Sequence, residues 1–177
     1  KMKTLEPCTL MIFGAGGNLA RIKLIPALFR LETAGRLPEK MVILASSLES
    51  WTREQWLDEV TTMLHNKYPK GYDEQAFKRF RARLHYHPNP PGDADTYQKL
   101  HKLLDEDSTF PPNVVFYMSV RPAEFPGIIE KLGGVGLLKQ KKGWRRVVIE
   151  KPFGHDLLSA QTLQSSLYKH LDEPQIF

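Results

Sequence analysis

The 177-residue chain is poor in cysteine and contains no long hydrophobic run. Cys8 is its single cysteine, so an internal disulfide is excluded, and a reducing compartment, the cytoplasm, is expected. No apolar stretch approaches the ~18 residues of a membrane span, and the N-terminal residues lack the apolar core of a signal peptide. His85 and His87 have no further ligands at metal-binding spacing, so no metal site is expected.

A strong excess of charge of one sign is also missing, since the net charge is only +5. The densest basic run, residues 139–146, contains Gly143 and lies between a helix-like and a strand-like segment. This position favours a solvated loop over a patch that binds nucleic acid. We therefore expect no nucleic-acid partner and no membrane partner.

Short apolar runs alternate with segments of helical periodicity from one end of the chain to the other. Strands are expected at residues 9–13, 41–45, 84–87, 113–120 and 145–150. Helices are expected at residues 18–34, 53–66, 74–83, 94–105, 123–132 and 157–171. This order predicts an α/β fold with a doubly wound, mostly parallel, Rossmann-like sheet and helices on both faces. Residues 1–177 are expected to form one dinucleotide-binding domain.

Three glycines, Gly14, Gly16 and Gly17, lie between the first strand and the first helix. Glycine permits positive φ and a close approach of the backbone to a ligand. The amides and dipole of a helix N-terminus attract phosphate, so the turn is a candidate pyrophosphate site. Its pattern is G-x-x-G-x-x-A, with Ala20 last, rather than a strict G-x-G-x-x-G. A tight turn that binds nothing is the structural alternative.

Two segments carry a family resemblance. The segment "FGAGGNLARIKLIPALFRL" resembles F-G-A-S-G-D-L-A-x-x-K-x-x-P-x-L of the glucose-6-phosphate dehydrogenases. The segment "VVIEKPFGHDLLSAQTLQSSL" resembles V-x-x-E-K-P-F-G-x-D-L-x-S-A of the same family. The second match is the longer and more specific of the two.

The resemblance implies an oxidoreductase of glucose metabolism, in the pentose phosphate pathway. In this family a hydride passes from C1 of glucose 6-phosphate to a nicotinamide, and a histidine acts as general base. That histidine and the sugar-phosphate segment belong to a β+α domain, which is expected to be absent from this chain. The fragment alone is therefore expected to be inactive and to contain no catalytic residue. Homo-oligomer formation is expected only with the missing domain.

The resemblance also implies which residues bind ligands. Lys151, in E-K-P-F-G, is expected to contact both the substrate and the coenzyme. The expected coenzyme-binding residues are Gly14, Ala15, Gly16, Gly17, Asn18, Leu19, Arg21, Lys23, Ser46, Ser47, Phe125 and Lys151.

The chain departs from the family pattern at several positions. Asn18 replaces an aspartate but still suits a helix cap. Leu48 stands where the family has an arginine that grips the 2′-phosphate of NADP. Ser46 and Ser47 remain as hydrogen-bond donors, and Glu49 is suited to a free ribose 2′-hydroxyl. NADP is the coenzyme that the family implies, and NAD remains possible.

Two other readings stay open on the sequence. One is a related Rossmann sugar oxidoreductase, although the "FGHDL" continuation argues against it. The other is a non-catalytic nucleotide-binding paralogue, in which the altered end of the second strand marks a degenerate site.

Overall fold

A computed structural model describes residues 6–149 of the chain. Its centre is a five-stranded sheet in which all neighbouring strands are parallel, in the order β3-β2-β1-β4-β5. The strands are β1 (Thr9–Phe13), β2 (Val42–Ser46), β3 (Leu84–Tyr86), β4 (Val114–Met118) and β5 (Arg145–Ile149). The Rossmann-like α/β fold expected from the sequence is confirmed.

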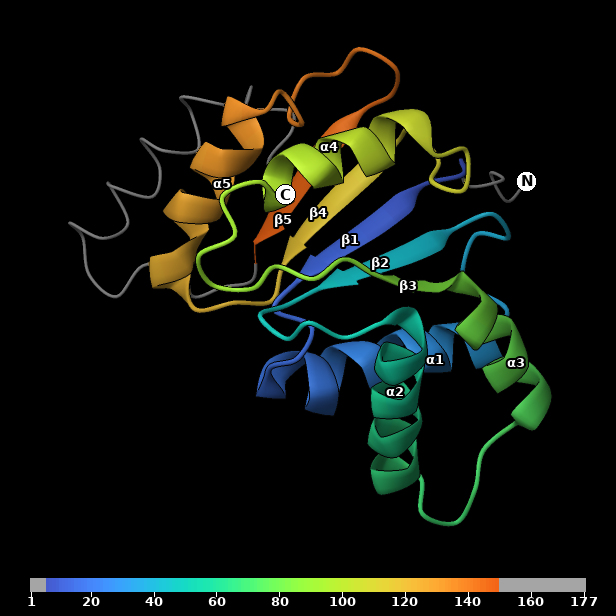
Figure 1. The fold of residues 1–177 in the computed structure, drawn as a ribbon. Helices are drawn as coiled ribbons and strands as arrows, with labels where there is room; N and C mark the ends of the chain where they lie inside the picture. The colour runs from blue at the N-terminus through green and yellow to red at the C-terminus, as the bar shows by residue number, and fades with distance from the viewer. Residues whose placement is uncertain (1–5, 150–177) are drawn as a thin grey trace.

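The helices cover both faces of this sheet (Figure 1). On one face lie α1 (Ile25–Thr33), α2 (Arg53–Lys67) and α3 (Glu74–Arg83), and on the other lie α4 (Thr96–Glu106) and α5 (Phe125–Gly134). A 3₁₀ turn, η2 (Pro122–Glu124), leads into α5. Since helices pack on both faces, the central strands β1 and β4 are largely apolar on both sides.

Successive residues of β1 pack alternately into two separate hydrophobic cores. Leu10 and Ile12 pack among the side chains of α1, α2 and α3. Met11 and Phe13 point to the opposite face and pack among those of α4 and α5. This alternation follows from the period of two along a strand. All five residues of β1 are buried, which fixes the end of the strand and therefore the turn that follows.

The first helix contains a wider turn before Pro26. Residues 18 and 19 are helical, and a π-helical segment, η1 (Ala20–Leu24), connects them to α1. In this segment the Ile25 amide donates to the carbonyl of Ala20, five residues back. Pro26 has no amide to donate, and it stands in the first turn of α1, where proline is tolerated. Accordingly, α1 begins beside Pro26, at Ile25.

Several helix ends are fixed by capping residues. Thr52 and Gln55 form a capping box at the start of α2, and the Asp73 carboxylate accepts two amides at the start of α3. Gly35 ends α1 with a φ of 69°. Helix α5 ends at Gly134, one of the two glycines expected to close it, and Gly136 just beyond has a positive φ of 80°. The expected helix over residues 157–171 lies outside the described residues.

A buried ion pair joins α1 to α3. The Glu32 carboxylate, only 3% exposed, lies 3.1 Å from a guanidinium nitrogen of Arg83. Arg83 also donates to the carbonyls of Pro38 and Met41. The pair thus fixes the loop that leads into β2, the strand that ends at the candidate site.

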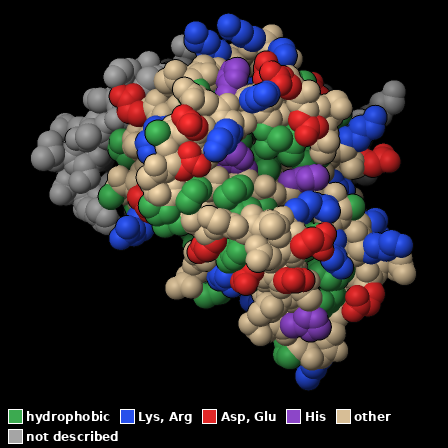
Figure 2. All heavy atoms as spheres, viewed as in Figure 1, with side chains coloured by type: hydrophobic (Ala, Val, Ile, Leu, Met, Phe, Trp, Pro, Cys, Tyr) green, Lys and Arg blue, Asp and Glu red, His purple; other side chains and the backbone are tan. Residues whose placement is uncertain are grey.

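The surface carries charges of both signs. On the face in Figure 2, Lys and Arg side chains are interspersed with Asp and Glu side chains. Among the described residues, no helix is both long and apolar enough to cross a membrane.

Candidate functional site

Gly14 begins the glycine turn at the end of β1 with a conformation that disfavours other residues. Its φ is 80°, and a Cβ built on it would overlap the carbonyl oxygen of Ser119 and lie 2.7 Å from Val120 Cγ1. The amides of Gly14 and Ala15 both donate to the carbonyl of Ser46, at 2.9 and 3.1 Å. The turn is therefore clamped between the ends of β2 and β4, and a side chain at position 14 has no room.

The beginning of the first helix follows this turn without a side-chain cap. The Gly17 amide closes the turn onto the carbonyl of Gly14, at 3.0 Å, and the Arg21 amide makes the next bond, to Gly17. The amides of Asn18 and Leu19 precede Arg21, whose amide is the first with a helical acceptor, so helix geometry supplies them with none. Such amides, with the helix dipole, form a site for an anion.

The Arg21 side chain holds the glycine turn through a hydrogen bond and an ion pair. Its Nε donates to the carbonyl of Gly16 at 3.0 Å, and a terminal nitrogen lies 2.6 Å from the Glu59 carboxylate on α2. About a third of each side chain is exposed, so the ion pair itself adds little to stability. Its geometric effect is to hold the Gly16 carbonyl, and with it the turn, in a fixed position.

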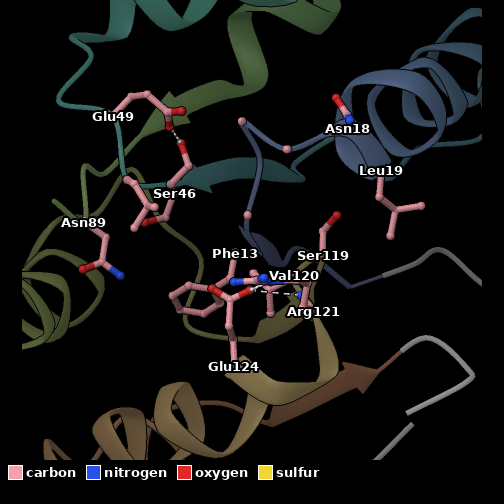
Figure 3. Close-up of a pocket in the computed structure, with 15 residues that line it drawn as sticks. Phe13, Asn18, Leu19, Ser46, Glu49, Asn89, Ser119, Val120, Arg121 and Glu124 are labelled. Atoms are coloured by element: carbon pink, nitrogen blue, oxygen red, sulfur yellow. Dashed lines mark hydrogen bonds and ion pairs between the residues drawn. The ribbon is translucent and has the colours of Figure 1, made fainter. Parts of the chain in front are cut away.

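A cleft of about 520 Å³ opens over the turn. Figure 3 shows Asn18 and Leu19 on one side of it and Glu49 and Asn89 on the other. It lies at the carboxyl ends of β1, β2 and β4, where parallel α/β sheets bind ligands. The cleft is lined by Phe13, Gly14, Gly16, Gly17, Asn18, Leu19, Ser46, Ser47, Leu48, Glu49, Asn89, Ser119, Val120, Arg121 and Glu124.

Two buried hydroxyl groups of the cleft lack a partner within the described part of the chain. Ser46 is 1% exposed and Ser119 is 6% exposed, and the Oγ of each makes no hydrogen bond there. Ser46 is the last residue of β2 and Ser119 follows β4, the two strands on either side of β1, so the two hydroxyls flank Gly14. Buried hydroxyls without partners are costly, so these two are suited to bonds with a bound ligand.

The segment after β2 presents a carboxylate to the cleft. The Ser47 hydroxyl donates to Glu49 Oε2 at 2.6 Å, and it also lies 2.8 Å from the Tyr86 hydroxyl. Burial raises the pKa of Tyr86, so this hydroxyl keeps its proton at neutral pH. Leu48, between the two polar residues, is 62% exposed and offers only apolar atoms.

A partly buried histidine, His87, holds the segment after β3 against α4. His87 Nε2 lies 3.0 Å from the carbonyl of Thr96, and burial lowers the pKa of this imidazole. Because a carbonyl only accepts, the neutral ring places its proton on Nε2. This contact ties the start of the segment that carries Asn89 to the first turn of α4. Among residues 6–149 no cluster of His, Cys, Asp or Glu is arranged to hold a metal ion.

The structure brings most of the predicted residues together but not all. Gly14, Gly16, Gly17, Asn18, Leu19, Ser46 and Ser47 line the cleft. Ala15 and Phe125 are buried in the two cores. Lys23 is exposed and, like Arg21, is not among the lining residues. Lys151 lies outside the described residues.

Five lining residues had drawn no attention as candidates: Phe13, Asn89, Ser119, Val120 and Glu124. The sequence could have indicated Ser119 as a site residue, because it is a polar residue at the carboxyl end of a buried strand. It could not have indicated Asn89, since Asn89 lies in a proline-rich segment whose path the sequence does not reveal.

Known proteins similar to this chain in sequence and in fold include dehydrogenases. The sequence profile described as "Glucose-6-phosphate dehydrogenase, NAD binding domain" matches residues 11–177. The chain is 34% identical to glucose-6-phosphate 1-dehydrogenase of Bacillus subtilis (strain 168) and 35% identical to that of Chlamydia pneumoniae. Each alignment covers 99% of this chain and 36% of the relative.

Solved structures agree with the sequence relatives. The crystal structure of glucose-6-phosphate 1-dehydrogenase from Mycobacterium avium superposes with a TM-score of 0.81 at 34% identity, over 96% of this chain and 35% of that one. A glucose-6-phosphate dehydrogenase in complex with its substrate glucose 6-phosphate gives 0.83 at 31% identity, over 100% and 37%. This chain thus spans about a third of the length of its relatives. With the profile match over nearly its whole length, the chain belongs to the glucose-6-phosphate dehydrogenase family, whose NAD-binding domain it represents.

Proposed function

We propose that this chain is the coenzyme-binding domain of an enzyme that oxidises glucose 6-phosphate to 6-phosphogluconolactone, with hydride transfer to a nicotinamide coenzyme. Family membership supports the reaction. The observation that carries the binding role is the cleft itself, in which the free amides at the start of the first helix lie beside the glycine turn.

The residues of the cleft fit a dinucleotide. The amides of Asn18 and Leu19 suit the diphosphate, because they need an acceptor and lie at the positive end of the helix dipole. The hydroxyls of Ser46 and Ser119 suit ligand oxygens on either side of the turn, since both are buried and without partners among the described residues. When bound, the nicotinamide ring supplies the hydride acceptor, and the protein positions it.

Lys151 and a second domain complete the proposal. Lys151 follows β5 closely in the sequence and, as the family resemblance implies, contacts both the sugar and the nicotinamide end of the coenzyme. An ammonium group donates hydrogen bonds without accepting a proton, which suits a positioning role at a sugar hydroxyl. We propose that the general base and the sugar-phosphate site lie in a β+α domain outside residues 1–177, and that the enzyme forms homo-oligomers through that domain.

The test is turnover by the complete protein that carries this domain. Glucose 6-phosphate with NAD or NADP should yield reduced coenzyme, measured by its absorbance, while residues 1–177 alone should yield none. Lys151→Ala should abolish most of the turnover but leave coenzyme affinity within about threefold, a change worth less than 1 kcal/mol. Lys67→Ala, at the exposed end of α2, is the matched control and should change neither.

Two outcomes would contradict the proposal. One is the absence of glucose 6-phosphate oxidation by the complete protein with either coenzyme. The other is full activity in Lys151→Ala, which would remove that residue from the site but not the domain from the family.

A further inference from the structure

The segment after β2 bears on which coenzyme the cleft accepts, and this inference rests on the proposed function. In dinucleotide-binding folds the ribose that carries adenine lies near the carboxyl end of the second strand. There an acidic residue bonds a free 2′-hydroxyl, whereas an arginine accommodates a 2′-phosphate. In this chain the segment reads Ser46-Ser47-Leu48-Glu49, with a carboxylate and without a cation.

The Glu49 carboxylate is held toward the glycine turn by the fold. Ser47 Oγ donates to Glu49 Oε2 at 2.6 Å, and the Tyr86 hydroxyl donates to the Glu49 backbone carbonyl. A Cβ on Gly16 would lie only 2.8 Å from the same Oε2. The carboxylate is therefore in contact with the turn on which we place the diphosphate, and its other oxygen remains available to a ligand.

The other charges lining the cleft do not offset this carboxylate. Arg121 lies on the opposite wall, 86% exposed, and its Nε is 3.5 Å from Glu124. Glu124 also accepts the Arg121 amide. Leu48, 62% exposed, offers no donor to a phosphate. Among the described lining residues there are thus two carboxylates and one guanidinium, and that guanidinium is paired with an acid.

We propose that Glu49 sets the coenzyme preference of this domain and that the preferred ligand has a free ribose 2′-hydroxyl, as in NAD. The carboxylate accepts a hydrogen bond from that hydroxyl. A 2′-phosphate in the same place would bring a dianion against a carboxylate that Ser47 and Tyr86 hold in position. The preference is thus opposite to the NADP that the family resemblance implied.

The size of the effect follows from the chemistry of the contact. A hydrogen bond to a charged acceptor exceeds one to a neutral acceptor by roughly five- to tenfold in affinity. Like charges about 4 Å apart cost at least about fivefold for each pair even in bulk water, and more near a protein surface. Together these effects predict a preference for the free hydroxyl of about tenfold or more.

The experiment compares two ligands that cannot undergo the reaction. Calorimetric titration of the complete protein with ADP-ribose and with 2′-phospho-ADP-ribose should give tighter binding of ADP-ribose by about tenfold or more. In Glu49→Gln the amide oxygen still accepts from Ser47. ADP-ribose should bind about five- to tenfold more weakly and the phosphorylated ligand more tightly, so the preference disappears. Glu54→Gln, an exposed change of the same charge on α2, should leave both affinities as they are.

The outcomes separate the two proposals. Tighter binding of 2′-phospho-ADP-ribose by the wild type overturns the inference without any variant, and so does an unchanged ratio in Glu49→Gln. In both cases the dinucleotide site itself stands. If the wild type binds neither ligand, the proposed coenzyme-binding function fails and the inference fails with it.

Discussion

Gly14→Ala tests whether the turn is as tightly enclosed as the structure shows. Alanine at a φ of 80° costs about 1–2 kcal/mol, because its Cβ meets its own backbone. The new Cβ would also overlap the Ser119 carbonyl, so β4 and the turn must separate. The hydrogen bond from Ser119 to Phe13 fixes that spacing, and the bond from Gly14 to Ser46 holds the turn to β2; each is 2.9 Å long. Weakening both costs about 1 kcal/mol each, for a total of about 3–4 kcal/mol.

Gly35→Ala is the matched control, because it isolates the backbone cost. Gly35 also has a positive φ, of 69°, but a Cβ there meets nothing within 4 Å. Its expected cost is only about 1 kcal/mol, since alanine also restricts the unfolded chain. Urea unfolding followed by the fluorescence of the buried Trp56 measures both variants. The reasoning is refuted if Gly14→Ala and Gly35→Ala lose the same free energy of unfolding.

Three other substitutions test separate features. Arg21→Ala should weaken ADP-ribose binding by about fivefold, because the Gly16 carbonyl loses its donor. The free energy of unfolding should change by less than about 1 kcal/mol. An unchanged affinity in calorimetric titration would contradict this. Arg83→Ala leaves Glu32 buried without its closest partner and should lower the free energy of unfolding in urea by about 3–5 kcal/mol. Arg79→Ala, which changes a side chain that is 56% exposed, should lower it by less than about 1 kcal/mol. Equal losses would refute the role of the buried pair. Burial lowers the pKa of His87, so the unfolded state binds the proton first and stability should fall as pH drops below about 6.5. His87→Gln should flatten that slope in thermal unfolding scans, and an unchanged slope would assign it to other groups.

The fold could be predicted from the sequence because its signals are local. The apolar runs, the capping box of Thr52 and Gln55 and the cap at Asp73 each depend on residues close together in the chain. The π-helical segment before Pro26 could not, since a proline in a helical pattern is equally consistent with a kink or a start. Strand order depends on contacts between distant segments, and no local pattern specifies it.

Part of the candidate site could also be predicted from the sequence, and part could not. The glycine turn could be predicted, because three glycines between a strand and a helix indicate a tight turn. Arg21 looked like a phosphate ligand, and only the fold brings Glu59, far along the chain, within 2.6 Å of it. Phe125 aligned with a coenzyme position, yet the fold places its ring in the core under α5, 2% exposed. Such outcomes depend on tertiary packing, which single-residue patterns do not encode.

The central claim is that a diphosphate binds to the backbone amides where the first helix begins. Amide chemical shifts of the isotope-labelled protein, followed by NMR during titration with NAD, test it most directly. The account predicts that the largest changes occur at Gly16, Asn18 and Leu19 and saturate together with a single affinity. Saturable changes centred on another part of the surface, with these three amides unmoved, would contradict it.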